Sequence, residues 1–423
     1  MTTQEENDRL CLIEGDAPMG TAFRRYWLPF ALAEELPEPD CPPIRVRILG
    51  EDLVAFRDTD GAVGLLDAHC PHRQAPLYFG RNEECGLRCV YHGWKFDITG
   101  QCVDMPSEPD YSKFKYTIRA TAYPTWEAAG MLFAYLGPET LRPPTPDYEW
   151  VRVPESHRVV SKAMEHCNYL QAVEGGIDAV HTSFLHNNDI QSPLLLRSRD
   201  KHPPIEVQLT DFGYRYACLR DIGEGRVYAR VDNFLLPSMN SFSRTVDEIG
   251  QPAKLPIVTF LFWVPIDNVT TAIYNICCRT DPGAPFPPEF GPTQQANFGI
   301  GAANRIPGTY WNKRNIGNDY LIDRTVQRYK TYTGIEGIGV QDYAVQEGMG
   351  LICDRTKEHV ASSDRAVVAA RKLLLEMVET VQSGGDPKGL RPESHRAARA
   401  ADKFIGADTE WRGALAGEMA AVW

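Results

Sequence analysis

The order of hydrophobic and polar positions divides the chain into two regions that differ in their periodicity. Between residues 26 and 136, short runs rich in β-branched and aromatic residues alternate with turn signals such as Asp60-Gly61 and Thr99-Gly100. These runs predict strands at 44–49, 53–57, 63–66 and 131–135. We therefore expect a small all-β domain in this part of the chain.

Beyond residue 150 the chain mixes helical and strand-like periodicity. Apolar residues recur at helical spacing in 168–185 and in 365–381. Strand-like runs occupy 205–209, 214–219, 226–234, 258–264 and 270–277. A long helix packed on a curved antiparallel sheet is an α+β arrangement, which is the fold class that we expect.

A proline-rich segment separates the two regions. Residues 137–154 contain five prolines, a density that suits an interdomain linker. The sequence thus predicts a domain over residues 1–150 and a second domain over residues 151–423.

Composition narrows the classes of function. The 423 residues carry a formal charge of −12 and no long basic run, which disfavours nucleic-acid binding. No apolar run reaches the length of a membrane span, and the N-terminus is polar and acidic. We expect a cytoplasmic protein that does not bind membranes. Its eleven cysteines are then not expected to form a disulfide framework.

Two short motifs combine cysteine with histidine. Cys70-x-His72 is followed, after sixteen intervening residues, by Cys89-x2-His92. Each motif offers one thiolate and one imidazole, so the two can hold a [2Fe–2S] cluster with both cysteines on one iron and both histidines on the other, the Rieske arrangement. A structural zinc site is the alternative. Cys2His2 zinc sites usually pair cysteine with cysteine and histidine with histidine, so the mixed order favours the cluster.

A second motif, Glu174-x3-Asp178-x2-His181-x4-His186, lies in the predicted helix. Residues at i, i+4 and i+7 share a helix face, so Glu174, Asp178 and His181 are expected to point together. His186 lies about 140° around an ideal helix from His181. The helix must therefore end or bulge near 182–185 if both imidazoles are to reach one metal.

Two imidazoles and one carboxylate form the facial triad of non-haem Fe(II) oxygenases. Iron is favoured over zinc because electrons delivered by a cluster would have nowhere to go on a zinc ion. Spacing alone does not choose the third ligand among 56 acidic residues.

The chain resembles a known family along nearly its whole length. The segment CPHRQAPLYFGRNEECGLRCVYHGWKFDITG, residues 70–100, resembles the Rieske domain of aromatic-ring-hydroxylating oxygenases. The opening PMGTAFRRYWLPF and the block over 318–381 are similar to the catalytic (alpha) subunits of the phthalate dioxygenase-like branch. The resemblance implies an all-β Rieske domain followed by a helix-grip (START/Bet v1-like) catalytic domain.

The resemblance also implies residue roles and partners. In VQDYAVQEGMGLICDRTKEHV it gives Asp342 as the third iron ligand. It implies that Asp178 links His181 to His92 of an adjacent chain, in a homotrimer or stacked trimers. It further implies a separate NAD(P)H-dependent reductase with flavin and an iron–sulfur cluster, since this sequence has no Gly-rich dinucleotide fingerprint.

The implied activity is O2-dependent dihydroxylation of a small, phthalate-like aromatic carboxylate, with O-demethylation of a methoxylated aromatic acid as the alternative. A carboxylate substrate calls for a buried arginine. Arg244 is our first choice and Arg220 our second, while Arg230 and Arg279 remain candidates. Two other classes stay open, namely a Rieske electron carrier without oxygenase activity and a module that only binds hydrophobic ligands.

Overall fold

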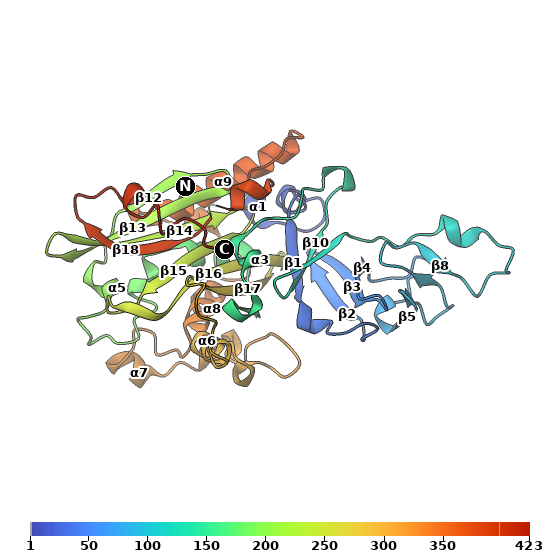
Figure 1. Cartoon of the computed structure of the whole chain (residues 1–423), viewed down its shortest axis with the longest axis horizontal. Coiled ribbons are helices and arrows are strands. Elements are labelled where there is room, and N and C mark those ends of the chain that lie inside the picture. The colour runs from blue at the N-terminus through green and yellow to red at the C-terminus, as the bar shows by residue number, and fades with distance from the viewer. Residues whose placement is uncertain (1, 397) are drawn as a thin grey trace.

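The computed structural model describes residues 2–396 and 398–423 as an elongated molecule, with three small sheets towards one end and one large sheet at the other (Figure 1). The small sheets comprise β1 (Trp27–Leu32), β10 (Met131–Tyr135) and β9 (Thr125–Ala128); β2 (Ile44–Ile48), β3 (Glu51–Arg57) and β4 (Val63–Asp67); and β5 (Arg81–Glu83), β6 (Gly86–Arg88), β7 (Lys95–Phe96) and β8 (Cys102–Asp104). All four strands predicted in this region are confirmed. Strand β1 and the five strands β5–β9 were missed.

The large sheet is antiparallel and has the order β11-β17-β16-β15-β14-β13-β12, with β18 paired to β14. Its strands are β11 (Arg158–Glu165), β12 (Ile205–Leu209), β13 (Gly213–Gly223), β14 (Arg226–Leu235), β15 (Met239–Val246), β16 (Pro252–Asp267), β17 (Thr270–Arg279) and β18 (Ala401–Gly406). The five predicted strands are confirmed, whereas β11, β15 and β18 were missed.

The helices surround this sheet and link it to the N-terminal region. They are α1 (Gln4–Cys11), α2 (Pro18–Phe23), α3 (Glu149–Arg152), α4 (Tyr169–Ile177), α5 (Leu196–Arg199), α6 (Phe290–Phe298), α7 (Arg324–Tyr329), α8 (Ile338–Gly348), α9 (Arg365–Gln382), α10 (Pro392–His395) and α11 (Trp411–Ala414). The α4 helix packs against β16 and also contacts α8 and α9. No helix in the described part of the chain is long and apolar enough to cross a membrane.

Two adjacent glycines explain how closely α4 packs. A Cβ atom on Gly176 would lie 2.0 Å from the Trp263 ring of β16, and one on Gly175 would lie 2.0 Å from the Gln346 amide of α8. Glycine weakens a helix interior, but here it lets α4 fit between the sheet and α8. This packing places the end of α4 beside α8.

The prediction of one helix over 168–185 is wrong in its second half. The α4 helix ends at Ile177, and a short 3-10 helix covers His181–Ser183. The carboxylate of Asp178 accepts hydrogen bonds from the backbone N–H groups of Val180 (2.7 Å) and His181 (3.3 Å). An aspartate that bonds its own following backbone competes with helical hydrogen bonds, which is why the helix stops there.

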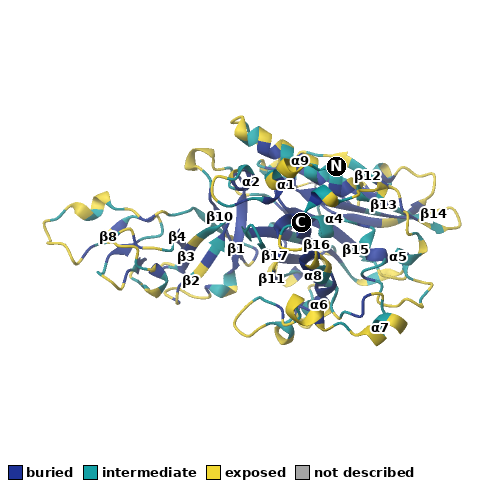
Figure 2. Cartoon of the chain, turned by 180° about the vertical axis from the view of Figure 1, so that it is seen from behind, coloured by how far each residue is buried: buried dark blue, intermediate teal, exposed yellow. Residues whose placement is uncertain are grey.

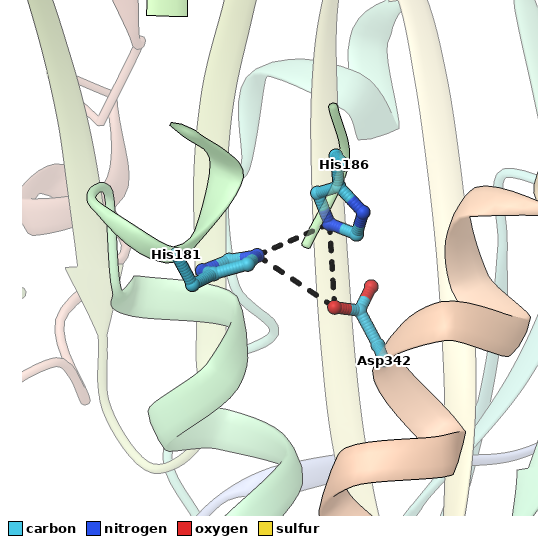
Figure 3. A group of neighbouring side chains, drawn as sticks. All are labelled: His181, His186 and Asp342. Atoms are coloured by element: carbon cyan, nitrogen blue, oxygen red, sulfur yellow. Dashed lines mark hydrogen bonds and ion pairs between the residues drawn. The ribbon is translucent and has the colours of Figure 1, made fainter. Parts of the chain in front are cut away.

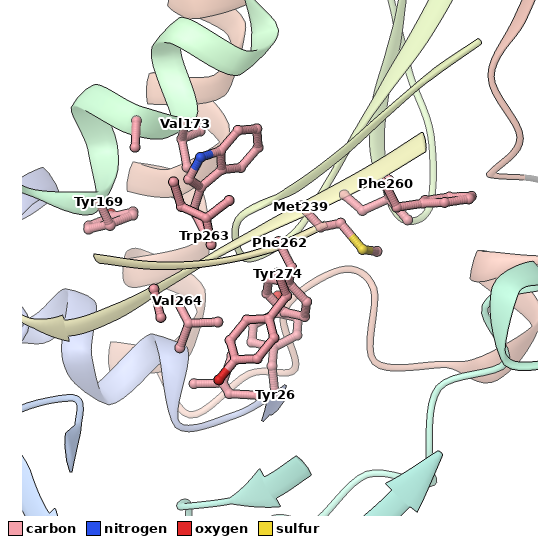
Figure 4. Close-up of a cluster of buried hydrophobic side chains, with 14 of the residues drawn as sticks. Tyr26, Tyr169, Val173, Met239, Phe260, Phe262, Trp263, Val264 and Tyr274 are labelled. Carbon is pink, nitrogen blue, oxygen red and sulfur yellow. The ribbon is translucent and has the colours of Figure 1, made fainter. Parts of the chain in front are cut away.

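One continuous hydrophobic core joins the N-terminal arm, β1, the large sheet and α9. Figure 4 shows its centre, where Trp263 and Val173 face each other across the α4–β16 contact and Tyr274 lies beside Phe262. Trp150, inside the proline-rich segment, is fully buried in this core. A second, smaller core lies under the cluster motifs, where the loops beyond it are largely exposed (Figure 2). The division of domains at residue 150 stays a prediction.

Candidate metal centres

The two cysteine–histidine motifs meet at the tips of neighbouring loops. Cys70 is 1% exposed and Cys89 is 2% exposed, and the rings of His72 and His92 lie with their centroids 4.5 Å apart. Burial, followed by the nearby charge of Cys89, raises the pKa of Cys70 to about 12. A thiolate in such a place is stabilised by a bound metal cation, so the donor set fits a cluster.

Residues of the two loops pack against the histidine rings. The Trp94 ring stacks on His72 at 4.2 Å and donates through Nε1 to Ser107 (2.9 Å). Gly93 has φ +79, and a Cβ atom there would lie 2.6 Å from Pro106. His92 Nδ1 is buried and has no hydrogen-bond partner among residues 2–396 and 398–423. An unpartnered imidazole nitrogen at this position fits an iron ligand.

His181, His186 and Asp342 converge on one point although they come from separate segments (Figure 3). His181 Nε2 lies 3.1 Å from His186 Nε2, and Asp342 Oδ1 lies 3.6 and 3.3 Å from the two nitrogens. Divalent metal ions bind nitrogen and carboxylate ligands at about 2.0–2.2 Å, so ligands at right angles stand about 3 Å apart. The three atoms therefore fit one ion on a single face, which leaves its other positions open.

Hydrogen bonds fix which imidazole nitrogen faces that point. His181 Nδ1 donates to the backbone carbonyl of Asp178 at 2.6 Å, and His186 Nδ1 donates to Gln341 Oε1 at 2.8 Å. The Gln341 amide nitrogen in turn donates to Asn188 and to the carbonyl of Ile335. Both Nε2 atoms are thus left as acceptors for a metal.

The electrostatics agree with neutral imidazoles. Burial lowers the pKa of His181 and the neighbouring His186 lowers it further, although the Asp342 carboxylate opposes the shift. A neutral imidazole is the form that binds metal. Gln341 was not identified from the sequence, and its position directly before Asp342 on α8 was the only available signal.

Glu174 does not accompany Asp178 and His181 as the helical spacing predicted. Its carboxylate is bound by Arg355 (2.8 Å) and by Arg371 (2.6 Å). Arg355 is 1% exposed and also reaches Asn7 of α1. Glu174 therefore anchors α4 to the N-terminal helix and to α9, because two guanidinium groups hold it away from the triad.

A cavity of about 360 Å³ adjoins the triad and is lined by Asp178, His181, His186 and Asp342. Its walls are mainly apolar and include Phe242, Leu255, Ile257, Leu261, Phe298 and Ile338. Arg244 and Arg220 both line it, as do Arg197 and Arg230. Arg279, which the sequence left as a candidate, does not line it.

The four arginines of the cavity differ in their partners. Arg197 is paired with Glu248, and Arg230 with Asp232. Arg220 donates to the carbonyls of Ala179 (2.8 Å) and Asp200 (2.7 Å) and to the Ser183 hydroxyl.

Arg244, by contrast, forms no ion pair or hydrogen bond with any described residue, and it lies beside the Phe242 and Phe298 rings. Burial, and then the charge of Arg197, lowers the pKa of Arg244.

This fold, with its two sets of iron-binding side chains, defines a Rieske-type non-haem iron oxygenase. The Rieske [2Fe-2S] domain model matches residues 26–118, and the LigXa C-terminal domain like model matches residues 134–421. The chain belongs to the Rieske oxygenase family, in its phthalate dioxygenase-like branch. Its cofactors are a Rieske [2Fe–2S] cluster and a mononuclear non-haem iron.

Relatives that match this chain over more than nine-tenths of their length support this assignment. The chain is 37% identical to a phthalate 4,5-dioxygenase oxygenase subunit of Pseudomonas putida, over 97% of this chain and 94% of the relative. It is 34% identical to a 3-chlorobenzoate-3,4-dioxygenase oxygenase subunit of Comamonas testosteroni, over 92% of each. The crystal structure of dicamba monooxygenase bound to 3,6-dichlorosalicylic acid has the same fold, with a TM-score of 0.61 at 20% identity over 85% of this chain and 98% of that one.

Proposed function

We propose that this oxygenase dihydroxylates a small aromatic carboxylate of the phthalate type. The observation that carries the proposal is Arg244, whose guanidinium has no ion pair or hydrogen bond with any described residue and lies in a mainly apolar cavity that also contains the triad. A desolvated cation without a counter-ion is costly, so a site of this kind is suited to an anionic ligand. The two relatives named above act on phthalate and on 3-chlorobenzoate, both aromatic carboxylates.

In this proposal Cys70, His72, Cys89 and His92 hold the cluster, and His181, His186 and Asp342 hold the iron. When bound, the iron activates O2 and the cluster supplies electrons. Arg244 binds the substrate carboxylate through two parallel N–H donors and so sets the orientation of the ring. The apolar walls hold the ring and exclude water from the reacting face.

Arg220 has a supporting role in the proposal. Its donors are occupied by the carbonyls of Ala179 and Asp200 and by the Ser183 hydroxyl, and Ala179 and Ser183 flank His181. These bonds hold the loop after α4 in place, since a buried guanidinium fixes the carbonyls that it contacts. We therefore rank Arg220 as a positioning residue and Arg244 as the carboxylate-binding residue.

Partners are part of the same proposal. A separate NAD(P)H-dependent flavin and iron–sulfur reductase would supply electrons, because the sequence has no dinucleotide fingerprint of its own. The cluster loops lie at the end of the molecule far from α8 (Figure 1), and both His92 and Asp178 are only partly buried. The two residues would meet between copies of the chain, which favours the homotrimer with Asp178 as the bridge. The cytoplasmic location stays a prediction.

Product analysis with isotopically labelled O2 tests the activity. We expect phthalate, supplied with NADH and a reductase, to give a cis-diol that carries two labelled oxygens. Release of formaldehyde from a methoxybenzoate, with no phthalate oxidation, would instead establish the O-demethylase alternative. Asp342→Ala should lose the mononuclear iron while it keeps the visible spectrum of the cluster. Retention of that iron would contradict the assignment of the third ligand.

A further inference from the structure

Glu165, the last residue of β11, is a fully buried carboxyl group without a basic partner. Its exposed fraction is 0%, and no ion pair joins it to any described lysine, arginine or histidine. One end of the Gln346 side-chain amide lies 2.5 and 3.2 Å from its two oxygens. The titratable groups around it are Glu347, Asp342, Tyr343, Tyr320 and Cys167. Burial, and then the charge of Glu347, raises the pKa of Glu165 well above its usual value, which favours the protonated form of this carboxyl.

On its inner side Glu165 connects to the metal centre through α8. Gln346 stands one helical turn after Asp342, on the same helix face. Both residues line a small cavity of about 60 Å³, together with Asn275. A cavity needs about 10–15 Å³ and two to four polar partners to hold a water molecule, and this one meets both conditions. Water there would join the Glu165–Gln346 pair to the Asp342 side of the triad.

On the other side, towards the surface, lie Glu347 and a second cavity. The Glu347 carboxylate accepts from the backbone N–H of His166 (2.9 Å) and from the Tyr320 hydroxyl. Glu347 lines a cavity of about 310 Å³ that includes Ile316, which is 56% exposed. The cavity therefore reaches the surface, and Glu347 links it to the backbone N–H of His166, the residue directly after the buried carboxyl.

We propose that Glu347, Glu165 and water beside Gln346 form a proton relay from the outer cavity to the metal centre. Dihydroxylation combines the arene with O2, two electrons and two protons to give a cis-diol. The electrons come from the reductase, and the protons come from solvent through this route. The inference rests on the oxygenase activity, but it does not depend on which aromatic acid is the substrate.

A purely structural role for Glu165, tying β11 to α8, predicts different results from a relay. Infrared spectroscopy of the holoenzyme at neutral pH should show the C=O band of a protonated carboxyl that disappears in Glu165→Gln. Glu149→Gln is the matched control, because Glu149 is also buried but is paired with Arg399 at 2.9 Å. If the band survives in Glu165→Gln, the relay proposal is overturned.

The second measurement is phthalate turnover at full iron occupancy. Glu165→Gln should lower kcat about tenfold or more and enlarge the solvent deuterium isotope effect, with KM for phthalate unchanged. Glu165→Asp, which keeps a titratable carboxyl, should retain more of the rate. A structural role would instead lower iron content or melting temperature and leave the isotope effect alone. Wild-type kcat and isotope effect in Glu165→Gln would overturn the relay.

If the wild-type protein does not oxidise phthalate, the proposed substrate fails and the relay is still tested. The infrared band requires no substrate. The rate is then measured on the reduction of O2 to hydrogen peroxide, which also consumes two electrons and two protons.

Discussion

Replacing Arg244 by methionine should weaken catalysis and stabilise the protein at the same time. Methionine keeps much of the side-chain length and removes a guanidinium of the cavity wall that has no ion-pair partner among the residues that the structure describes. A hydrogen bond to a charged group contributes about 1.5–3 kcal/mol, so loss of a bidentate carboxylate contact should cost about 3–4 kcal/mol of transition-state binding. This corresponds to a fall in kcat/KM for phthalate of about 10²–10³-fold.

The free protein should respond in the opposite direction. Burial lowers the pKa of Arg244, which means that its charge is destabilised in the folded state. Replacing an uncompensated buried charge by an apolar side chain of similar size is expected to stabilise the fold by about 1 kcal/mol. The melting temperature of Arg244→Met should therefore stay the same or rise by a degree or two.

Steady-state kinetics and thermal melts of two variants separate these effects. Arg197→Met is the matched control, since Arg197 lines the same cavity but is paired with the half-exposed Glu248. It should lose at most a few-fold in kcat/KM and less than about 1 kcal/mol of stability. A value of kcat/KM for Arg244→Met within threefold of wild type, with a lowered melting temperature, would refute the reasoning and make Arg244 a structural residue.

Three further predictions concern Asp178, Gln341 and His395. Asp178→Asn should load both iron centres, because His181 Nδ1 bonds the backbone carbonyl of residue 178, yet turnover should collapse; near-normal turnover would remove the bridging role. Gln341→Leu should weaken iron binding about 10–100-fold in a chelator competition, since His186 Nδ1 loses its acceptor; unchanged affinity would contradict that role. Burial lowers the pKa of His395 to about 4, whereas an unfolded histidine titrates near 6.5, so the unfolded chain binds more protons between these values. Stability should fall by about 3 kcal/mol as pH drops from 6.5 to 4, and urea titrations should show a smaller fall in His395→Phe.

The cluster motifs and the histidine pair could be identified from the sequence because their members lie within a few residues of one another. A chain segment that short brings Cys70 near His72, and His181 near His186, in almost any compact fold. The same holds for strands such as β10 and β12, whose apolar patterns are local.

Tertiary packing decided which residue is the third metal ligand and which residues pair with Glu174. It also decided which arginine of the cavity has no partner among the described residues. Asp342 reaches the histidines because Gly175 and Gly176 let α4 lie against α8 and β16. Arg355 and Arg371, which are distant in the sequence, bind the Glu174 carboxylate and hold it away from the triad. The α4 helix ends at Ile177 because the Asp178 carboxylate bonds the backbone that follows it, and this bond competes with the hydrogen bonds of a continued helix.

Residue type and spacing thus determine which groups can act chemically, because ligand chemistry and turn geometry are local properties. Whether a charge is paired, buried or free depends on every segment packed around it. Arg220 and Arg244 differ in this way although both are arginines in strands of one sheet. Only the folded chain assigns three acceptors to Arg220 and, within the described part of the chain, none to Arg244, since those acceptors come from segments that the fold brings together.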